Sequence, residues 1–278
     1  MSVATAKAPK AGRKKRGSSG VIQNLAAPLT VVGLIVLWAV VVAVFNVPSY
    51  LVPGPAAVWQ STVENSSEIL KHTWVTLWES LAGFGLGVII GIPLAILITS
   101  SKMLERIIYP LLVASQAIPK VALAPLLLVW MGYGLGPKIV VAFLLTFFPV
   151  VVNTASGLAS VPGEMTMLVH SMGASRWTTF RKVRFPSAVP SMMAGFKVAV
   201  ALAVVGAVVG EFVGSQSGLG YYLLVATGNF DTPLVFACVL ALTIMGVVLF
   251  YLMSAVGGLL GRWTRGMDGG ESAGSWSS

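Results

Sequence analysis

Apolar residues occur along the chain in long runs that short polar stretches separate. A membrane-spanning helix needs about 20 mostly apolar residues, and six runs satisfy this: 27–45, 77–99, 107–131, 138–157, 187–213 and 234–260. Gly, Pro or a charged residue interrupts the second, third and fifth runs, which indicates that these helices face other helices rather than lipid. The pattern predicts an all-α integral membrane protein with six transmembrane helices.

The distribution of basic residues predicts the orientation in the membrane. Only 10% of the residues are charged, against about 25% in soluble domains. If the N-terminus is cytoplasmic, fourteen of the 18 Lys and Arg residues fall on the cytoplasmic side, as the positive-inside rule requires. We therefore expect a multi-pass protein with both termini in the cytoplasm. Topology accounts for the net charge of +9 without a nucleic-acid partner.

Three regions follow from this pattern. Residues 1–24 are rich in Lys and Arg and lack periodicity, which predicts a disordered basic cytoplasmic arm. Residues 25–263 form the transmembrane domain, and residues 264–278 are expected to be a flexible cytoplasmic tail. A cleaved signal peptide is disfavoured, because the first apolar run is long and no small-x-small cleavage site follows it.

Two glycine repeats and two prolines mark the interior of the spans. Gly83, Gly87 and Gly91 share one helix face, and Gly206, Gly210 and Gly214 repeat this spacing. Small residues at this spacing let helix backbones approach closely, either in ordinary packing or in an interface that lines a path. Pro119 and Pro125 are expected to break the third span, which is tolerated beside helix neighbours or a cavity.

Five polar residues are candidates for a translocation path. Lys120 and Lys197 lie at depth, where a lysine is costly and usually faces an interior or a water-filled route. They could attract an anionic substrate, or they could pair with carbonyls or snorkel. Glu211 could pair with a basic group or gate the path. The other two are polar candidates that a single helix hydrogen bond would also explain: Gln116 and Asn153.

The sequence contains no recognisable catalytic or metal-binding motif. His72 and His170 fall in different connections, and Cys238 is the only cysteine. No HExxH motif and no phosphate-binding GxxxxGK[ST] loop occurs. We therefore expect no catalytic residues, no metal site and no bound cofactor, and any ATP hydrolysis would belong to a partner.

The polar interruption at 162–190, PGEMTMLVHSMGASRWTTFRKVRFPSAVP, predicts a helix–Gly–helix elbow. Glu164 suits the first turn of a helix, and Gly173 can adopt the left-handed conformation that ends it. Ser175 can cap the second helix, and Pro186 with Pro190 opens the fifth span. The apolar stripe of the first helix is expected to pack on the spans: Met165, Leu168, Val169 and Met172. The alternative is an amphipathic loop that lies on anionic lipid.

The spacing in this loop resembles a known signature. Nine residues follow Gly173 before Val183-Arg184-Phe185-Pro186, which resembles the cytoplasmic loop of permease subunits of bacterial type I ABC importers. That signature begins with Glu-Ala-Ala, whereas this chain has Met167-Leu168-Val169; Glu164 is the nearby candidate replacement. Residues 117–139, 157–164 and 211–223 resemble the nitrate, sulfonate and taurine branch of these permeases.

The resemblance implies a function and its partners. It implies a permease subunit in a bacterial plasma (inner) membrane, with a type I importer fold. The implied partners are a second permease chain (identical or sibling), a pair of ATPase subunits that use ATP and Mg, and an extracytoplasmic solute-binding protein. The solute would be small and anionic, of sulfonate, taurine, nitrate, aromatic or vitamin-precursor type. The coupling loop, 160–186, would contact the ATPase through Glu164, Met167, Leu168, His170, Gly173, Ala174, Ser175 and Arg176.

The alternative is a secondary transporter or channel that needs no ATPase. Inverted repeats would favour it, and the two halves of the sequence show none.

Overall fold

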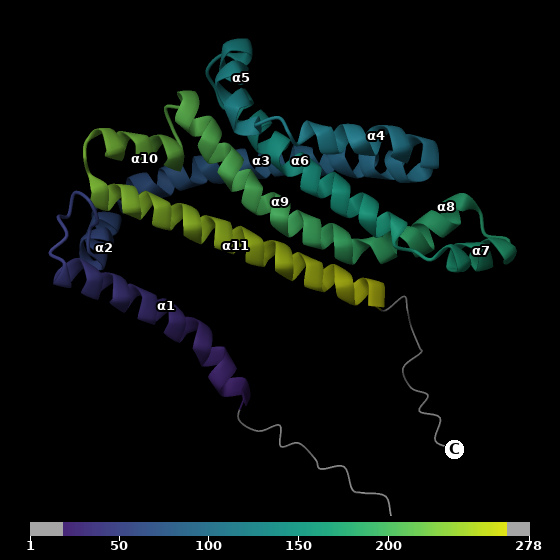
Figure 1. Ribbon diagram of the computed structural model, residues 1–278, viewed down its shortest axis with the longest axis horizontal. Helices are drawn as coiled ribbons and strands as arrows, with labels where there is room; N and C mark the ends of the chain where they lie inside the picture. Colours follow the sequence, from purple (N-terminus) through teal and green to yellow (C-terminus); the bar gives the residue numbers. More distant parts are fainter. Residues whose placement is uncertain (1–18, 266–278) are drawn as a thin grey trace, which may run out of the picture.

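The computed structural model describes residues 19–265, and within that range every regular element is helical. Figure 1 shows four long helices running alongside one another, α3, α6, α9 and α11. The short helices α7 and α8 lie at one end of this bundle, and α2 and α10 lie at the other. The bounds are α1 Ser19–Val44, α2 Pro55–Glu64, α3 Ser66–Ser100, α4 Lys102–Ser115, η1 Lys120–Leu123, α5 Ala124–Met131, α6 Leu135–Ala159, α7 Gly163–Ser171, α8 Arg176–Thr179, η2 Phe180–Arg184, α9 Phe185–Gly214, α10 Leu219–Gly228 and α11 Thr232–Arg265.

Four helices are long and apolar enough to cross a membrane, and they correspond to the expected second, fourth, fifth and sixth spans. They are Ser66–Ser100, Leu135–Ala159, Arg176–Gly214 and Thr232–Leu260. A bent pair, Lys102–Ser115 with Lys120–Met131, could form a fifth. The described apolar part of α1, Leu29–Val44, is shorter than a full span. The total of six transmembrane helices therefore stays a prediction.

The expected third span, 107–131, is not one helix. Its two halves meet at an angle of 75°, and the break follows Ser115, the last residue of α4. Pro119 explains the break, because it lacks a backbone N–H and disfavours helical geometry at the residue before it. Pro125 stands in the first turn of α5, where a missing N–H costs nothing.

The second half of the elbow is also longer than expected. Residues 176–214 form one helix that passes without interruption through Pro186, so the prediction of a separate short helix before the fifth span is wrong. The turn Phe180–Arg184 has π-helical geometry. This wider turn accommodates the missing N–H of Pro186 and keeps the helix continuous.

α6 packs between α3 and α9 through small residues, as the glycine repeats predict. A Cβ atom added at Gly83 would overlap the Cβ atom of Ala142, and one at Gly206 would lie 2.5 Å from the Cα atom of Ala142. One turn further on, a Cβ atom at Gly87 would lie 2.5 Å from Oγ1 of Thr146. The two glycine faces thus hold α6 at backbone contact from both sides.

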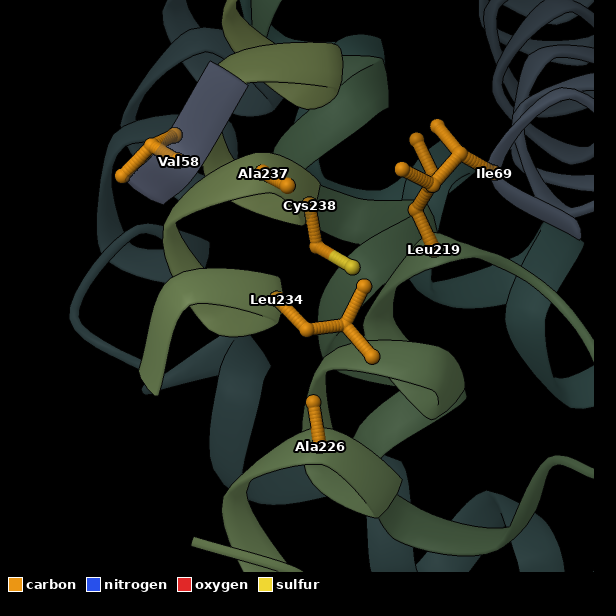
Figure 2. Close-up of a cluster of buried hydrophobic side chains, with 7 residues drawn as sticks. All are labelled: Val58, Ile69, Leu219, Ala226, Leu234, Ala237 and Cys238. Carbon is orange, nitrogen blue, oxygen red and sulfur yellow. The ribbon is translucent and has the colours of Figure 1, made fainter. Parts of the chain in front are cut away.

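A second group of buried side chains joins the ends of the bundle where α2 and α10 lie. Figure 2 shows it: residues of α2, α3, α10 and α11 meet, and the thiol of Cys238 points into the group. Its members are Val58, Ile69, Leu219, Ala226, Leu234, Ala237 and Cys238. This cluster fixes α10, which connects α9 with α11, against α11.

α1 lies beside the bundle rather than within it (Figure 1). It begins at Ser19, before the expected start at residue 27, so residues 19–24 of the expected arm are helical. Trp38 stacks on Phe236 of α11 with ring centroids 5.9 Å apart. The remaining arm residues, 1–18, and residues 266–278 of the expected tail lie outside the described range.

The glycine packing makes a testable prediction with an internal control. Gly83→Ala should lower the free energy of unfolding by about 1–3 kcal/mol, because the added methyl overlaps α6. Gly85→Ala adds the same methyl on the same helix, where nothing lies within 4 Å, and should change stability by less than about 1 kcal/mol. Thermal unfolding of the purified protein, followed by circular dichroism, measures both. Equal losses in the two variants would contradict the packing described.

Candidate functional site

The elbow at 160–186 is a pair of helices joined by a tightly hydrogen-bonded turn. Gly173 has φ +84°, the left-handed conformation expected from the sequence. Its N–H donates to the carbonyl of His170 (2.9 Å), and the next N–H, of Ala174, donates to the carbonyl of Val169 (3.2 Å). These two bonds close α7 as a Schellman motif. Nδ1 of His170 lies 3.1 Å from the carbonyl oxygen of Ala174.

Ser175 starts the second helix in the way the sequence predicts. Its side chain accepts a hydrogen bond from the N–H of Thr178 (3.2 Å), and the two hydroxyl oxygens lie 2.9 Å apart. The helix end and the helix start are therefore both capped within a few residues. Such capping makes the elbow a defined corner rather than a loose loop.

The apolar stripe of α7 does not pack on the spans, so that prediction is wrong. Leu168 is 61% exposed and Met172 is 79% exposed, and α7 has no buried residue. Val169 and Met172 instead border a hollow of about 600 Å³ that lies at the corner with Ser175, Thr178 and Lys182. α8 continues directly into α9, and α7 lies beyond the end of the long helices (Figure 1).

Every candidate coupling residue lies on this corner. Met167 is 74% exposed, and Trp177, beside the candidate Arg176, is 68% exposed. Ala174 is half-buried, and the other candidates are exposed: Glu164, His170, Gly173, Ser175 and Arg176.

Arg184 anchors the elbow to the bundle, a role that the sequence pattern did not indicate. Its Nε and Nη2 atoms donate to the carbonyl oxygen of Leu158, at 3.3 and 3.2 Å. Leu158 lies in the last turn of α6, where carbonyls lack helical partners and attract cations. The base of the elbow is thus clamped to the end of α6.

Both lysines at depth lie over aromatic rings. Nζ of Lys120 is 5.7 Å from the ring centroid of Phe148 on α6, and Nζ of Lys197 is 6.0 Å from that of Phe250 on α11. Such cation–π contacts offset part of the cost of a lysine in an apolar setting. Among the described residues, neither lysine takes part in an ion pair.

The remaining path candidates do not join these lysines in one site. Gln116 is exposed at the end of α4. Asn153 donates from Nδ2 to the carbonyl oxygen of Pro149 (2.9 Å), the single helix bond that was the alternative reading. Glu211 lies in a separate cluster described next. Within residues 19–265, no hydrogen bond or ion pair connects any two of the five candidates.

A buried polar cluster lies at the end of the bundle opposite α7. Nζ of Lys138 donates to Oε1 of Glu79 (2.6 Å) and to Oγ of Ser215 (2.7 Å). Glu79 is 0%, Glu211 1% and Lys138 5% exposed. Lys138 stands in the first turn of α6, at the start of the expected fourth span. A Cβ atom added at Gly210 of α9 would lie 2.7 Å from the Cα atom of Lys138. Lys138 therefore lies in the contact between α6 and α9.

Glu211 and two residues of α3 cap the start of α10. Oε2 of Glu211 accepts from the N–H of Gly220 (2.5 Å) and Oγ1 of Thr76 from that of Leu219 (2.8 Å). Nδ1 of His72 accepts from the N–H of Gly218 (3.0 Å). Three successive amides that the helix leaves without backbone partners are thereby satisfied.

Sequence reasoning missed Glu79 and the role of Thr76. A signal was present, because Glu79 stands four residues before Gly83 and so continues the glycine face of α3. A charged residue on the same helix face as closely packed glycines is expected to point toward another helix.

Comparisons with known proteins agree on one family. Residues 83–266 match the family described as "Binding-protein-dependent transport system inner membrane component". "Formylaminopyrimidine transport permease protein ThiX" of Halalkalibacterium halodurans is 37% identical over 244 residues, 87% of this chain and 97% of that protein. "Riboflavin transport system permease protein RibX" of Chloroflexus aurantiacus is 40% identical over 243 residues, covering 86% and 90%.

A more distant relative and a solved structure extend the comparison. "Putative aliphatic sulfonates transport permease protein SsuC" of Bacillus subtilis is 28% identical over 262 residues, covering 94% of this chain and 93% of that protein. A chain of the inward-facing MetNI methionine ABC transporter superposes with a TM-score of 0.61 at 21% identity, over 73% of this chain and 98% of that chain. At this identity the structural likeness supports the fold alone.

The capping of α10 predicts an asymmetry between two threonines of α3. Thr76→Val should cost about 1–3 kcal/mol, because it leaves the buried N–H of Leu219 without a partner and removes the hydroxyl that donates to Glu211. Thr73→Val removes a hydroxyl bonded only to the carbonyl of Ile69 in its own helix and should be close to neutral. Thermal unfolding together with limited proteolysis at residues 214–218 distinguishes them. A Thr76→Val protein as stable and as resistant as the Thr73→Val control would refute the capping role.

Proposed function

The chain belongs to the family of binding-protein-dependent transport system inner membrane components, and from that premise we propose that it couples solute import to a separate ATPase subunit. It is an ABC transporter permease of a multi-pass inner-membrane type, as the match over residues 83–266 and its relatives indicate. The proposed assembly has two permease chains, identical or sibling, two ATPase subunits and an extracytoplasmic binding protein. We propose that both termini and the elbow face the cytoplasm, where the ATPase would be.

The observation that carries the coupling proposal is the exposed apolar face of α7. Met167, Leu168 and Met172 project from a short helix that the bundle does not cover. Exposed apolar side chains grouped in this way mark interaction surfaces. A helix with an apolar face fits a groove of a soluble partner. The helix that follows the corner carries exposed positive charge at Arg176, Arg181 and Lys182.

The elbow is built to transmit a displacement. A partner that moves α7 pulls on Gly173 and its two flanking caps, and α8 runs without a break into α9. The Arg184 clamp on the Leu158 carbonyl ties the same point to α6. Motion of α7 would therefore move α6 and α9 together, as two helices in close contact, rather than bend a loop.

The solute proposal rests on relatives and on the two lysines. The relatives of 37% and 40% identity are named for formylaminopyrimidine and riboflavin, and the 28% relative for aliphatic sulfonates. We therefore place heteroaromatic vitamin compounds and their precursors ahead of sulfonates, taurine and nitrate. Lys120 and Lys197, each beside an aromatic ring, suit a solute that has both a ring and a negative charge. The ATPase-independent transporter has no comparable support.

Replacing Gly173 tests the coupling role. Gly173→Val should abolish solute uptake while the protein still inserts, because a β-branched residue is strained at φ +84°. Gly163→Val is the control, since a Cβ atom at either glycine meets nothing within 4 Å and only Gly173 has a positive φ. Uptake in membrane vesicles, normalised to inserted protein, compares them. Wild-type uptake in the Gly173→Val variant would refute the elbow's role.

Copurification tests the partner directly. A tagged full-length chain, extracted with its neighbours in mild detergent, should retain an ATPase subunit. Exposed Leu168→Glu should release that subunit, because it places a negative charge in the apolar contact. Wild-type complexes that lack an ATPase would favour the ATPase-independent alternative.

The lysines at depth predict a charge-dependent effect on uptake. Lys197→Met should reduce uptake of an anionic solute by roughly tenfold, the scale of one partly buried charge contact. Lys102→Met changes an exposed lysine and should leave uptake unchanged. Initial uptake rates with labelled solute provide the measurement. Equal rates in the two variants would remove the lysine argument for an anionic solute.

A further inference from the structure

One oxygen of a fully buried carboxyl group has no partner among the described residues. Glu79 is 0% exposed, and its Oε2 makes no hydrogen bond, although its Oε1 accepts from Lys138. Buried polar atoms in native proteins are almost always hydrogen-bonded. An unpaired carboxylate oxygen in a membrane-spanning helix therefore needs an explanation of its own.

A second buried carboxyl group interacts with Glu79. Glu211 of α9 contacts Glu79 of α3 through their side-chain oxygens. Thr76 confirms the placement, because it lies one turn before Glu79 on α3 and its Oγ1 is 2.7 Å from Oε1 of Glu211. Two carboxyl groups in contact cannot both stay ionised at low cost.

The surrounding charges do not balance two carboxylates. From α6 the cluster receives one ammonium group, that of Lys138. From α3 it receives His72, whose Nδ1 accepts a hydrogen bond and so carries no proton. The α10 side contributes backbone amides, with Tyr221 and Tyr222 packed against the His72 ring. Two ionised carboxylates would leave a net negative charge out of reach of water, which is strongly unfavourable.

We propose that Glu211 binds a proton and donates it to the free oxygen of Glu79. Glu79 is then a carboxylate with both oxygens occupied, one by Lys138 and one by Glu211. Oε1 of Glu211, as the hydroxyl oxygen, still accepts from Thr76, and its Oε2 still accepts from Gly220. The cluster becomes neutral, and the orphaned oxygen gains a partner.

The bound proton gives the cluster a structural purpose beyond the transport function proposed above, and the inference does not depend on that function. The protonated carboxyl lets one residue bridge α3 and the start of α10 at the same time. Loss of the proton would place two negative charges side by side and push α9 from α3. The site is therefore a proton-binding site that fixes the end of the bundle opposite α7.

Infrared spectroscopy tests the proton directly. Full-length protein in lipid nanodiscs at neutral pH should show the carbonyl stretch of a protonated carboxylic acid, shifted by exchange into D₂O. Glu211→Gln should remove that band, and Glu164→Gln, at an exposed site, should leave it. A wild-type spectrum without the band, or a band that survives in Glu211→Gln, overturns the proposal.

Two isosteric variants give an independent test. Glu211→Gln keeps a neutral group that can donate to Glu79, and the half-life of the folded protein on heating should stay within about twofold of wild type. Glu79→Gln leaves Lys138 without its carboxylate and should shorten the half-life roughly tenfold or more. Failure of Glu79→Gln to accumulate counts as the severe loss expected, provided that Glu211→Gln accumulates. Equal damage from both variants, or greater damage from Glu211→Gln, overturns the proposal.

Discussion

The close contact of α6 with the glycine faces of α3 and α9 is the constraint on which the other features depend. Ala142 lies between Gly83 and Gly206 with no room for a further methyl group on either side. Helices in lipid gain little from the hydrophobic effect, so such backbone contact provides much of their affinity. The same register brings Lys138 opposite Glu79 four residues earlier on each helix. The buried ion pair therefore lies on the same helix faces as the glycine contacts, one turn earlier.

Both functional ends of the molecule are attached to α6. Near its first turn, Lys138 joins the cluster that fixes α10, and in its last turn the carbonyl of Leu158 holds Arg184 at the base of the elbow. In the proposed coupling, a displacement of α7 would reach α6, whose far end is bonded to α3 and packed against α9. These attachments connect the two ends of the bundle through one helix, in agreement with the coupling role that we propose.

The sequence predicted features that depend on local chemistry. Gly173 with a positive φ, the Ser175 cap and the glycine contacts follow from what single residues can adopt at given positions. Features that depend on distant partners were missed or wrong. The apolar stripe of α7 has the spacing of a helix that packs on another surface. The spacing does not indicate whether that surface belongs to the same chain or to a partner. Glu79 was not singled out, because its partner, Lys138, lies 59 residues away in the sequence. Pro119 indicated a break, but the angle of 75° depends on how the two halves pack.

The buried cluster also has a consequence for the order of synthesis. Glu79 leaves the ribosome first, Lys138 follows, and Glu211 comes last, so α3 enters the membrane before either of its polar partners exists. A lone carboxylate in lipid is costly, so α3 has its full set of polar partners only after α6 and α9 have been made. A chain cut short between residues 138 and 211 would contain the Glu79–Lys138 ion pair but would lack the carboxyl group that we propose completes it. The cluster is therefore complete only when α3, α6 and α9 have all been made.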